Sequence, residues 1–458
     1  MSALEDGYTR RMVRSRLLVS ILVWVIVGGI AVQADSWPRW RGPLATGEAP
    51  EGNPPVTWSE ERNVAWKVSV PGKGLSSPIV HGGRVFVTTA VAFGNPLESP
   101  EHEHEHDDGA HDNVVPDRRM RFDVLAYDVD DGSLVWSTTV RTEQPHEAAH
   151  VTGSWASPSA ITDGKRLYAS FGSRGLYALD LDGKVLWERD LGDMRVRHAH
   201  GEGSSPALRG DTLVVNWDHQ GDSFLVALDT ATGKTKWKTE RDEITSWSSP
   251  LIVPVGDRVQ VVVAATDRVR GYDMEDGSPI WECEGLSRNV VATPVATDGL
   301  VIVANSYDGK KMMAIRLAGA RGDITGTEHV VWERDRDTPY VPSPVLHEGR
   351  LYFLKHSHGF LTAVEAATGK TLFGPVRLGP VRNVFASPVV AAGRIYIPSR
   401  DGATLVAEAG TVFKTLAVNE LDDSFSASPA VAGDALFLRG DRHLYKIAAD
   451  QAPVSSAP

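Results

Sequence analysis

The sequence has little cysteine and no long apolar run beyond its N-terminal segment. Its single cysteine, Cys283, excludes an intramolecular disulfide. We expect Cys283 on a strand, packed as a small apolar residue rather than as a reactive thiol. No cysteine lies near residue 34, which excludes a lipid anchor of the bacterial lipoprotein kind at that position.

Positive charge is also scarce. The chain has 59 acidic and 47 basic residues and a net charge of −12. Binding to nucleic acid or to an anionic membrane surface needs a basic footprint, so neither is expected. At 42% hydrophobic and 23% charged residues, the composition is that of a globular protein.

Residues 1–34 are predicted to be an export signal. Four arginines between residues 10 and 16 precede an apolar stretch. That stretch is about 14 residues long, shorter than the roughly 20 needed to span a bilayer. Small residues ending at Ala34 suit cleavage. We therefore expect a periplasmic or extracellular protein with no stable membrane insertion after cleavage; an uncleaved anchor is the alternative.

Eight Ser-Pro or Thr-Pro pairs form a nearly regular series along the chain. The intervals between successive prolines are 80, 48, 44, 44, 50, 44 and 41 residues. After each pair come β-rich runs, a glycine turn and a run with an aromatic residue, which is typical of a four-stranded propeller blade. The pairs begin at Ser77, Ser157, Ser205, Ser249, Thr293, Ser343, Ser387 and Ser428.

The eighth unit has no aromatic strand of its own, but residues 63–70, with Trp66, supply one at the other end of the chain. The sequence therefore predicts an all-β, eight-bladed propeller whose last blade is completed by this N-terminal strand. Large indole rings are expected to dock between blades. The docking residues predicted are Trp66, Trp136, Trp187, Trp237, Trp281 and Trp332.

The domain organisation follows from these segments. Residues 35–62 form a Pro- and Trp-rich lead-in that lays Trp37 and Trp40 on the body, and residues 63–450 form the propeller. A His-rich insertion at about residues 93–119 accounts for the interval of 80, and residues 451–458 are expected to be a disordered tail.

The pattern Ala-x-Asp-x-x-(Thr/Asp)-Gly-Lys-x-x-Trp, clearest at residues 227–237, resembles the tryptophan-docking repeat of pyrroloquinoline-quinone-type (PQQ-type) propellers. These include quinoprotein alcohol dehydrogenases and the outer-membrane lipoprotein of the barrel-assembly machinery. Residues 37–43, 63–67, 76–78 and 246–250 resemble more closely the exported PQQ-like repeat proteins common in planctomycete-type bacteria. The resemblance covers about residues 37–448 and implies the propeller fold.

The quinoprotein resemblance implies a PQQ cofactor, a calcium ion held by Glu, Asn and Asp, a catalytic aspartate and a vicinal disulfide. One cysteine excludes that disulfide, and no motif here matches the ligand set. No cofactor is expected and no catalytic residue is assigned. PQQ with calcium, or a transition metal, remains the alternative.

Histidines supply two candidate metal clusters. In an extended chain, alternate histidines of the insertion would share one side and suit Zn, Ni or Cu; the alternative is a solvated loop that captures metal adventitiously. A second His-x-His precedes the third Ser-Pro pair. The candidate ligands are His102, His104, His106, His111, His198 and His200.

Residues just before each Ser-Pro pair are expected to face the central opening, if the family geometry holds. Their mixture suits a carbohydrate, a peptide or a small organic ligand, and a water-filled or plugged channel is the alternative. They are Lys73, Trp155, His200, Glu202, Trp247, Asn289, Tyr340, Asn383 and Ser424.

The function favoured by the sequence is a non-catalytic binding or scaffold propeller with a protein or small-molecule partner on one face. Two alternatives stay open: a quinone- or metal-dependent oxidoreductase, and a role in outer-membrane protein assembly.

Overall fold

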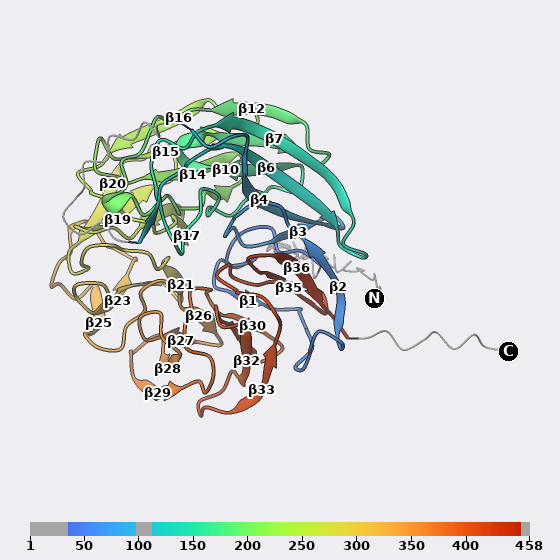
Figure 1. The fold of residues 1–458 in the computed structure, drawn as a ribbon. Coiled ribbons are helices and arrows are strands. Elements are labelled where there is room, and N and C mark those ends of the chain that lie inside the picture. The colour runs from blue at the N-terminus through green and yellow to red at the C-terminus, as the bar shows by residue number, and fades with distance from the viewer. Residues whose placement is uncertain (1–34, 98–111, 450–458) are drawn as a thin grey trace, which may run out of the picture. The chain divides into compact units, whose positions relative to one another are not determined.

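The computed structural model describes residues 35–97 and 112–449, in which the regular elements are strands and two short 3-10 turns, η1 (Gly172–Arg174) and η2 (Arg197–Ala199). The strands form eight main sheets around a common centre (Figure 1). Each contains four antiparallel strands, and two gain a parallel fifth. Within the described residues, no helix has the length and apolar character needed to cross a bilayer.

In each blade the strands follow one another from the centre outward. Blade one contains β3 (Ile79–His81), β4 (Arg84–Phe93), β6 (Arg119–Asp128) and β7 (Leu134–Glu143). Blade two contains β9 (Ile161–Thr162), β10 (Arg166–Ser170), β11 (Leu176–Asp180) and β12 (Val185–Arg189). Blade three contains β13 (Ala207–Arg209), β14 (Thr212–Trp217), β15 (Phe224–Asp229) and β16 (Thr235–Glu240). Blade four contains β17 (Leu251–Val255), β18 (Arg258–Val263), β19 (Val269–Asp273), β20 (Pro279–Cys283) and the added β24 (Gly322–Asp323).

The remaining blades follow the same order. Blade five contains β21 (Val295–Thr297), β22 (Leu300–Asn305), β23 (Lys311–Arg316) and β25 (Val330–Arg334). Blade six contains β26 (Val345–His347), β27 (Arg350–Leu354), β28 (Phe360–Glu365) and β29 (Thr371–Arg377). Blade seven contains β30 (Val389–Ala391), β31 (Arg394–Pro398), β32 (Ala403–Glu408), β33 (Thr415–Glu420) and the added β1 (Glu48–Ala49). Blade eight contains β34 (Ala430–Ala432), β35 (Ala435–Arg439), β36 (His443–Ile447) and β2 (Val64–Ser69).

The predicted eight-bladed fold and its closure are confirmed. β2 pairs antiparallel with β36, with Val68 opposite Leu444, so the first long strand of the chain is the outer strand of the last blade (Figure 1). The expected range for this strand, residues 63–70, differs from the observed one by one residue at each end. A closed ring leaves no blade without a neighbour on either side.

Tryptophans join most neighbouring blades in one recurring way. In blade three, for example, the turn glycine Gly233 has a φ of +68°, and a Cβ on it would lie 2.8 Å from the ring of Trp187 in blade two. Only glycine combines this backbone conformation with so close an approach. The indole N–H donates to a carbonyl of the same turn at 2.9–3.1 Å, as in the pairs Trp66–Val129, Trp136–Leu181, Trp187–Thr230, Trp237–Met274 and Trp332–Ala366.

Trp281 is the exception among the six predicted docking residues. Its indole N–H donates to Gln260 Oε1 within blade four at 2.9 Å. The next blade has an insertion where the glycine turn would be, and β24 from that insertion pairs with β20. Trp281 still packs in one apolar cluster with Val301 and Ile315 of blade five, so it contributes to the interface by a different contact.

Cys283 packs as the sequence predicts, and Phe413 does not. Cys283 lies on β20 and is 1% exposed, and burial raises the pKa of its thiol to about 11, which agrees with a packing role. The repeat pattern predicts Phe413 on the outer strand of blade seven, but this residue precedes β33 and packs against Phe373 of blade six instead.

Candidate functional site

A closed ring of hydroxyl groups lies at the centre of the propeller. In each blade the backbone N–H of one serine or threonine donates to the hydroxyl of the corresponding residue in the next blade, at 2.9–3.2 Å. The donor–acceptor order is Ser77, Ser159, Ser205, Ser249, Thr293, Ser343, Ser387, Ser428 and back to Ser77. These bonds satisfy buried N–H groups at the position where the blades converge.

The ring corrects one repeat boundary. The Ser-Pro pattern predicts that the second unit starts at Ser157, but Ser159 provides the ring hydroxyl of blade two. Ala160 therefore occupies the place that a proline has in the other seven units. Ser157 Oγ instead bonds locally, to the carbonyl of Ser154 at 3.0 Å.

A cavity of about 390 Å³ opens above this ring, and we call it the central cavity. The residue two positions before each ring hydroxyl lines it in all eight blades. These residues are Leu75, Ser157, Gly203, Trp247, Val291, Val341, Phe385 and Ser426. The remaining lining residues are Trp40, Ser77, His150, Thr152, Gly153, Ser159, His200, Ser205, Asn289, Tyr307, Tyr340, His356, Ser357, Ser387 and Ser428.

The lead-in occupies the centre at the level of the ring. Trp40 lines the central cavity and donates from Nε1 to the ring hydroxyl of Ser428 at 3.3 Å. Arg41 is 2% exposed and donates to the carbonyls of Pro388, at 2.9 Å, and Pro344. Burial lowers the pKa of Arg41 to about 9. As predicted, the lead-in packs on the body, and Trp37 is 1% exposed.

Aromatic side chains are held in place around the central cavity. Trp247 Nε1 donates to the carbonyl of Gly201 at 2.7 Å. Tyr340 packs between Tyr307 and His356, with ring centroids 5.5 and 4.7 Å away. Burial raises the pKa of the Tyr340 phenol to about 12. These contacts hold the aromatic rings in position without a ligand.

Two residues that line this cavity have a left-handed backbone. Asn289 and His356 have φ values of 61° and 56°, and ten other described non-glycine residues also have a positive φ. Non-glycine residues adopt this conformation at a cost of about 1–2 kcal/mol. Such strain occurs along the whole chain and does not mark this cavity.

Among the described residues that line the central cavity there is no Asp, Glu, Lys or Arg. Burial, the neighbouring His358 and Lys310 lower the pKa of His356 below its usual 6.5, so that imidazole is neutral at pH 7. The described lining, made of aromatic, hydroxyl, amide and imidazole groups, can hold an uncharged molecule without leaving a charge of that molecule unpaired.

Four of the nine predicted face residues line the central cavity: His200, Trp247, Asn289 and Tyr340. The structure places the other five elsewhere. Lys73 pairs with Ala90 in an isolated bridge and its Nζ donates to the carbonyl of Val151 at 2.8 Å. Asn383 pairs with His358 in a second bridge, and the backbone of Ser424 binds Asp423 and Asp441.

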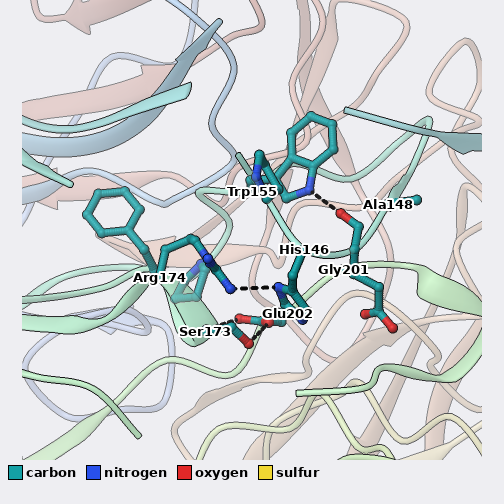
Figure 2. Close-up of a pocket in the computed structure, with 11 residues that line it drawn as sticks. His146, Ala148, Trp155, Ser173, Arg174, Gly201 and Glu202 are labelled. Carbon is teal, nitrogen blue, oxygen red and sulfur yellow. Dashed lines mark hydrogen bonds between the residues drawn. The ribbon is translucent and has the colours of Figure 1, made fainter. Parts of the chain in front are cut away.

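Trp155 and Glu202 line a second, much smaller space of about 20 Å³. Figure 2 shows His146, Ser173, Arg174 and Glu202 converging there. Glu202 Oε1 accepts from Ser173 Oγ at 2.5 Å and Oε2 from its backbone N–H at 2.7 Å. Burial raises the pKa of Glu202. The space holds about one water molecule, so the cluster links loops rather than binding a substrate.

The histidines come together only in part. The rings of His150 and His198 lie 4.7 and 5.3 Å from that of His200. Within the described ranges, no three His, Cys, Asp or Glu side chains are placed to hold a metal ion. The insertion's candidates, His102, His104, His106 and His111, lie outside the described residues.

The central cavity does not fit the calcium–quinone group that the fold family implies. Calcium takes about six to eight oxygen ligands, carboxylates prominent among them. Asn289 lies in the lining, but no carboxylate accompanies it among the described lining residues.

Similar proteins divide between two functions. The outer membrane protein assembly factor BamB of Yersinia pestis is 24% identical over 333 residues, covering 69% of this chain and 77% of that protein. Subunit 1 of a methanol dehydrogenase from Methylobacterium organophilum is 29% identical over 144 residues, which are 26% of this chain and only 22% of the relative.

Solved structures agree on the fold. The quinohemoprotein alcohol dehydrogenase of Comamonas testosteroni superposes with a TM-score of 0.59 at 10% identity, over 93% of this chain and 83% of that one. A europium-containing methanol dehydrogenase gives 0.57 at 10% identity, over 89% of each chain. At this identity the likeness concerns the fold alone.

A family model described as "Outer membrane protein assembly factor BamB" matches residues 56–246, 120–373 and 221–452, which overlap to cover most of the chain. With the eight-bladed ring and the tryptophan repeat, this match shows that the chain belongs to that family of PQQ-like propellers.

Proposed function

We propose that this protein is an exported, non-catalytic binding propeller and that its ligand site is the central cavity. The observation that carries the proposal is the cavity itself, about 390 Å³ and walled by aromatic rings, with no Asp, Glu, Lys or Arg among its described lining residues. Its volume falls within the roughly 300–1,000 Å³ of small-molecule sites.

The chemistry of the lining supports binding over catalysis. The imidazoles of His150 and His356 engage neighbouring hydroxyls, Thr152 Oγ1 at 2.7 Å and Ser357 Oγ at 3.0 Å. An imidazole base usually needs a carboxylate to orient it, and none is present among the lining residues that the structure describes. Serine hydroxyls of the ring are occupied by backbone N–H groups rather than by a base.

A ligand-observed NMR screen of neutral and charged fragments tests this proposal. We expect hits chiefly among neutral fragments, abolished in Trp247→Leu and kept in Phe360→Leu, because Phe360 lies outside the cavity lining. Fragments that bind the Trp247→Leu variant as well as the intact protein would contradict the assignment of the ligand site to the central cavity. Quinone bound in the presence of calcium, with dye-linked alcohol oxidation, would favour the oxidoreductase instead.

The family match favours a second candidate, a role in outer-membrane protein assembly. Such a role predicts that the full chain copurifies with a membrane barrel complex after cross-linking in cells. The export signal expected in residues 1–34 is consistent with this role. Mass determination of the mature N-terminus checks the expected cleavage near Ala34.

A further inference from the structure

The central cavity has two unlike halves. Blades four to seven place bulky apolar side chains two positions before the ring hydroxyl: Trp247, Val291, Val341 and Phe385. Blades eight, two and three place Ser426, Ser157 and Gly203 at the same position, with Leu75 of blade one between them. One wall is therefore apolar and the opposite wall mostly small and polar.

Hydrogen-bonding groups line the polar side and the ring, in addition to the Asn289, Tyr307, Tyr340, His356 and Ser357 side chains beside blades five and six. His150, Thr152 and His200 line the cavity beside blades two and three. Each ring hydroxyl accepts a backbone N–H, which leaves its own O–H as a donor. Five of these ring residues line the cavity: Ser77, Ser159, Ser205, Ser387 and Ser428.

A ring-shaped sugar matches this division. Its C–H face is apolar and suits an aromatic wall, and its edge carries hydroxyls that both donate and accept. Trp247 is already fixed by its bond to Gly201, so stacking on it costs little side-chain entropy. The lining favours an uncharged ligand, because a carboxylate, sulfate or ammonium would be desolvated with no Asp, Glu, Lys or Arg among the described lining residues to pair with it.

We propose that the central cavity binds a neutral saccharide, stacked on the wall formed by Trp247 and Phe385 and hydrogen-bonded to the serine and histidine side. This rests on the proposed function, since it requires the cavity to be the ligand site. It predicts weaker binding of uronic acids, sulfated sugars and amino sugars that are not acetylated.

Titration calorimetry with the full mature chain tests the proposal. The probes are glucose, N-acetylglucosamine, maltose and cellobiose, with glucuronate and glucosamine as charged counterparts. We expect at least one neutral sugar to bind and both charged sugars to bind at least tenfold more weakly. Trp247→Leu should lower the affinity for the neutral sugar at least tenfold.

Two phenylalanines provide a matched control. Phe385 lines the cavity with Arg400 over its ring at 5.0 Å, whereas Phe360 lies outside the lining with Arg377 over its ring at 4.7 Å. Phe385→Leu should weaken sugar binding several-fold and Phe360→Leu should change it less than twofold.

Other outcomes would contradict the proposal that the cavity binds a saccharide. If no neutral sugar gives heat, or if Phe360→Leu weakens binding as much as Phe385→Leu, the proposal is wrong. If neutral fragments bind in a Trp247-dependent way while sugars do not, the saccharide fails but the binding function stands. If the binding of neither fragments nor sugars depends on Trp247, the saccharide proposal and the proposed binding function are both wrong.

Discussion

At the scale of single residues, the contact between a tryptophan and a turn glycine carries much of the specificity between blades. The ring of Trp187 packs against Gly233, and its indole N–H donates to the carbonyl of Thr230 at 3.0 Å. The same arrangement recurs at Trp66, Trp136, Trp237 and Trp332. The glycine is needed twice, for its positive φ and for the space above it.

Gly233→Ala tests that double requirement. A Cβ there meets the left-handed strain and the Trp187 ring, whereas at Gly210, with a φ of +58°, nothing lies within 4 Å. We expect Gly210→Ala to lower the free energy of unfolding by about 1–2 kcal/mol. Gly233→Ala should add about 1–3 kcal/mol of overpacking. Urea denaturation measures both, and equal losses would refute the space argument.

The lowered pKa of His356 predicts that the stability of the protein depends on pH. Its pKa is lowered by burial first, and then by His358 and Lys310. A histidine whose folded pKa is depressed contributes stability that is present above about pH 6.5 and lost as the pH falls through the folded value. We expect the melting temperature to fall on acidification below pH 6.5, and to fall less in His356→Gln.

An NMR titration of the His356 ring checks the cause directly. The midpoint should lie below about 6.5, the value of an unperturbed histidine. Removing the positive charge of Lys310 by Lys310→Gln should raise the midpoint, because a positive neighbour disfavours the imidazolium. A midpoint at or above that unperturbed value would contradict the shift.

At the scale of elements, the sequence predicted the blades well and the cavity less well. The 44-residue period and the turn glycines identified the hairpins, because these depend on local backbone chemistry. The ring residue was harder to place, since Ser157-Pro158-Ser159 offers two serines in succession. Only the hydrogen bonds from neighbouring blades distinguish Ser159 from Ser157.

The same difficulty explains the mixed outcome for the predicted face residues. These residues stand three to five positions before the ring residue, apart from Trp247 at two. The tripeptide x-(Ser/Ala)-(Ser/Thr), found in six of the eight units, such as 75–77 and 247–249, was the available signal. Loops before it differ between blades, so Lys73 and Asn383 form bridges while Asn289, at the same offset, faces the cavity.

Ser159→Ala and Ser157→Ala separate the two interpretations of that segment. Ser159 Oγ accepts the buried N–H of Ser77 at 2.9 Å, and removing it leaves that donor without a partner. We expect a cost of about 1–3 kcal/mol in unfolding free energy. Ser157 bonds only within its own loop, so Ser157→Ala should cost clearly less in the same denaturation series. The reverse order would restore Ser157 as the start of the repeat.

At the scale of the whole molecule, the two ends of the propeller sequence meet in one blade. β2 pairs with β36, and Ala448 donates from its backbone to the carbonyl of Asn63 at 3.1 Å. Trp66 of β2 also reaches blade one through Val129. One short strand therefore completes blade eight and joins it to the next blade, so blades at both ends of the sequence depend on it.

Replacing residues 64–69 with a Gly-Ser linker of equal length tests this dependence. The outer edge of β36 would be left unpaired and no indole would bridge to blade one, so we expect the unfolding free energy to fall by at least about 3 kcal/mol, the cost of removing a buried tryptophan. Calorimetry should show the single unfolding transition broaden or split, because opening the ring uncouples its blades. A copy of residues 63–70 joined after Ala448 by a short turn should restore one transition, since the two backbones already lie within hydrogen-bond distance. If the linker variant melts like the intact chain, the strand does not close the ring; if the appended copy fails to rescue it, the destabilisation comes from the disturbed lead-in instead.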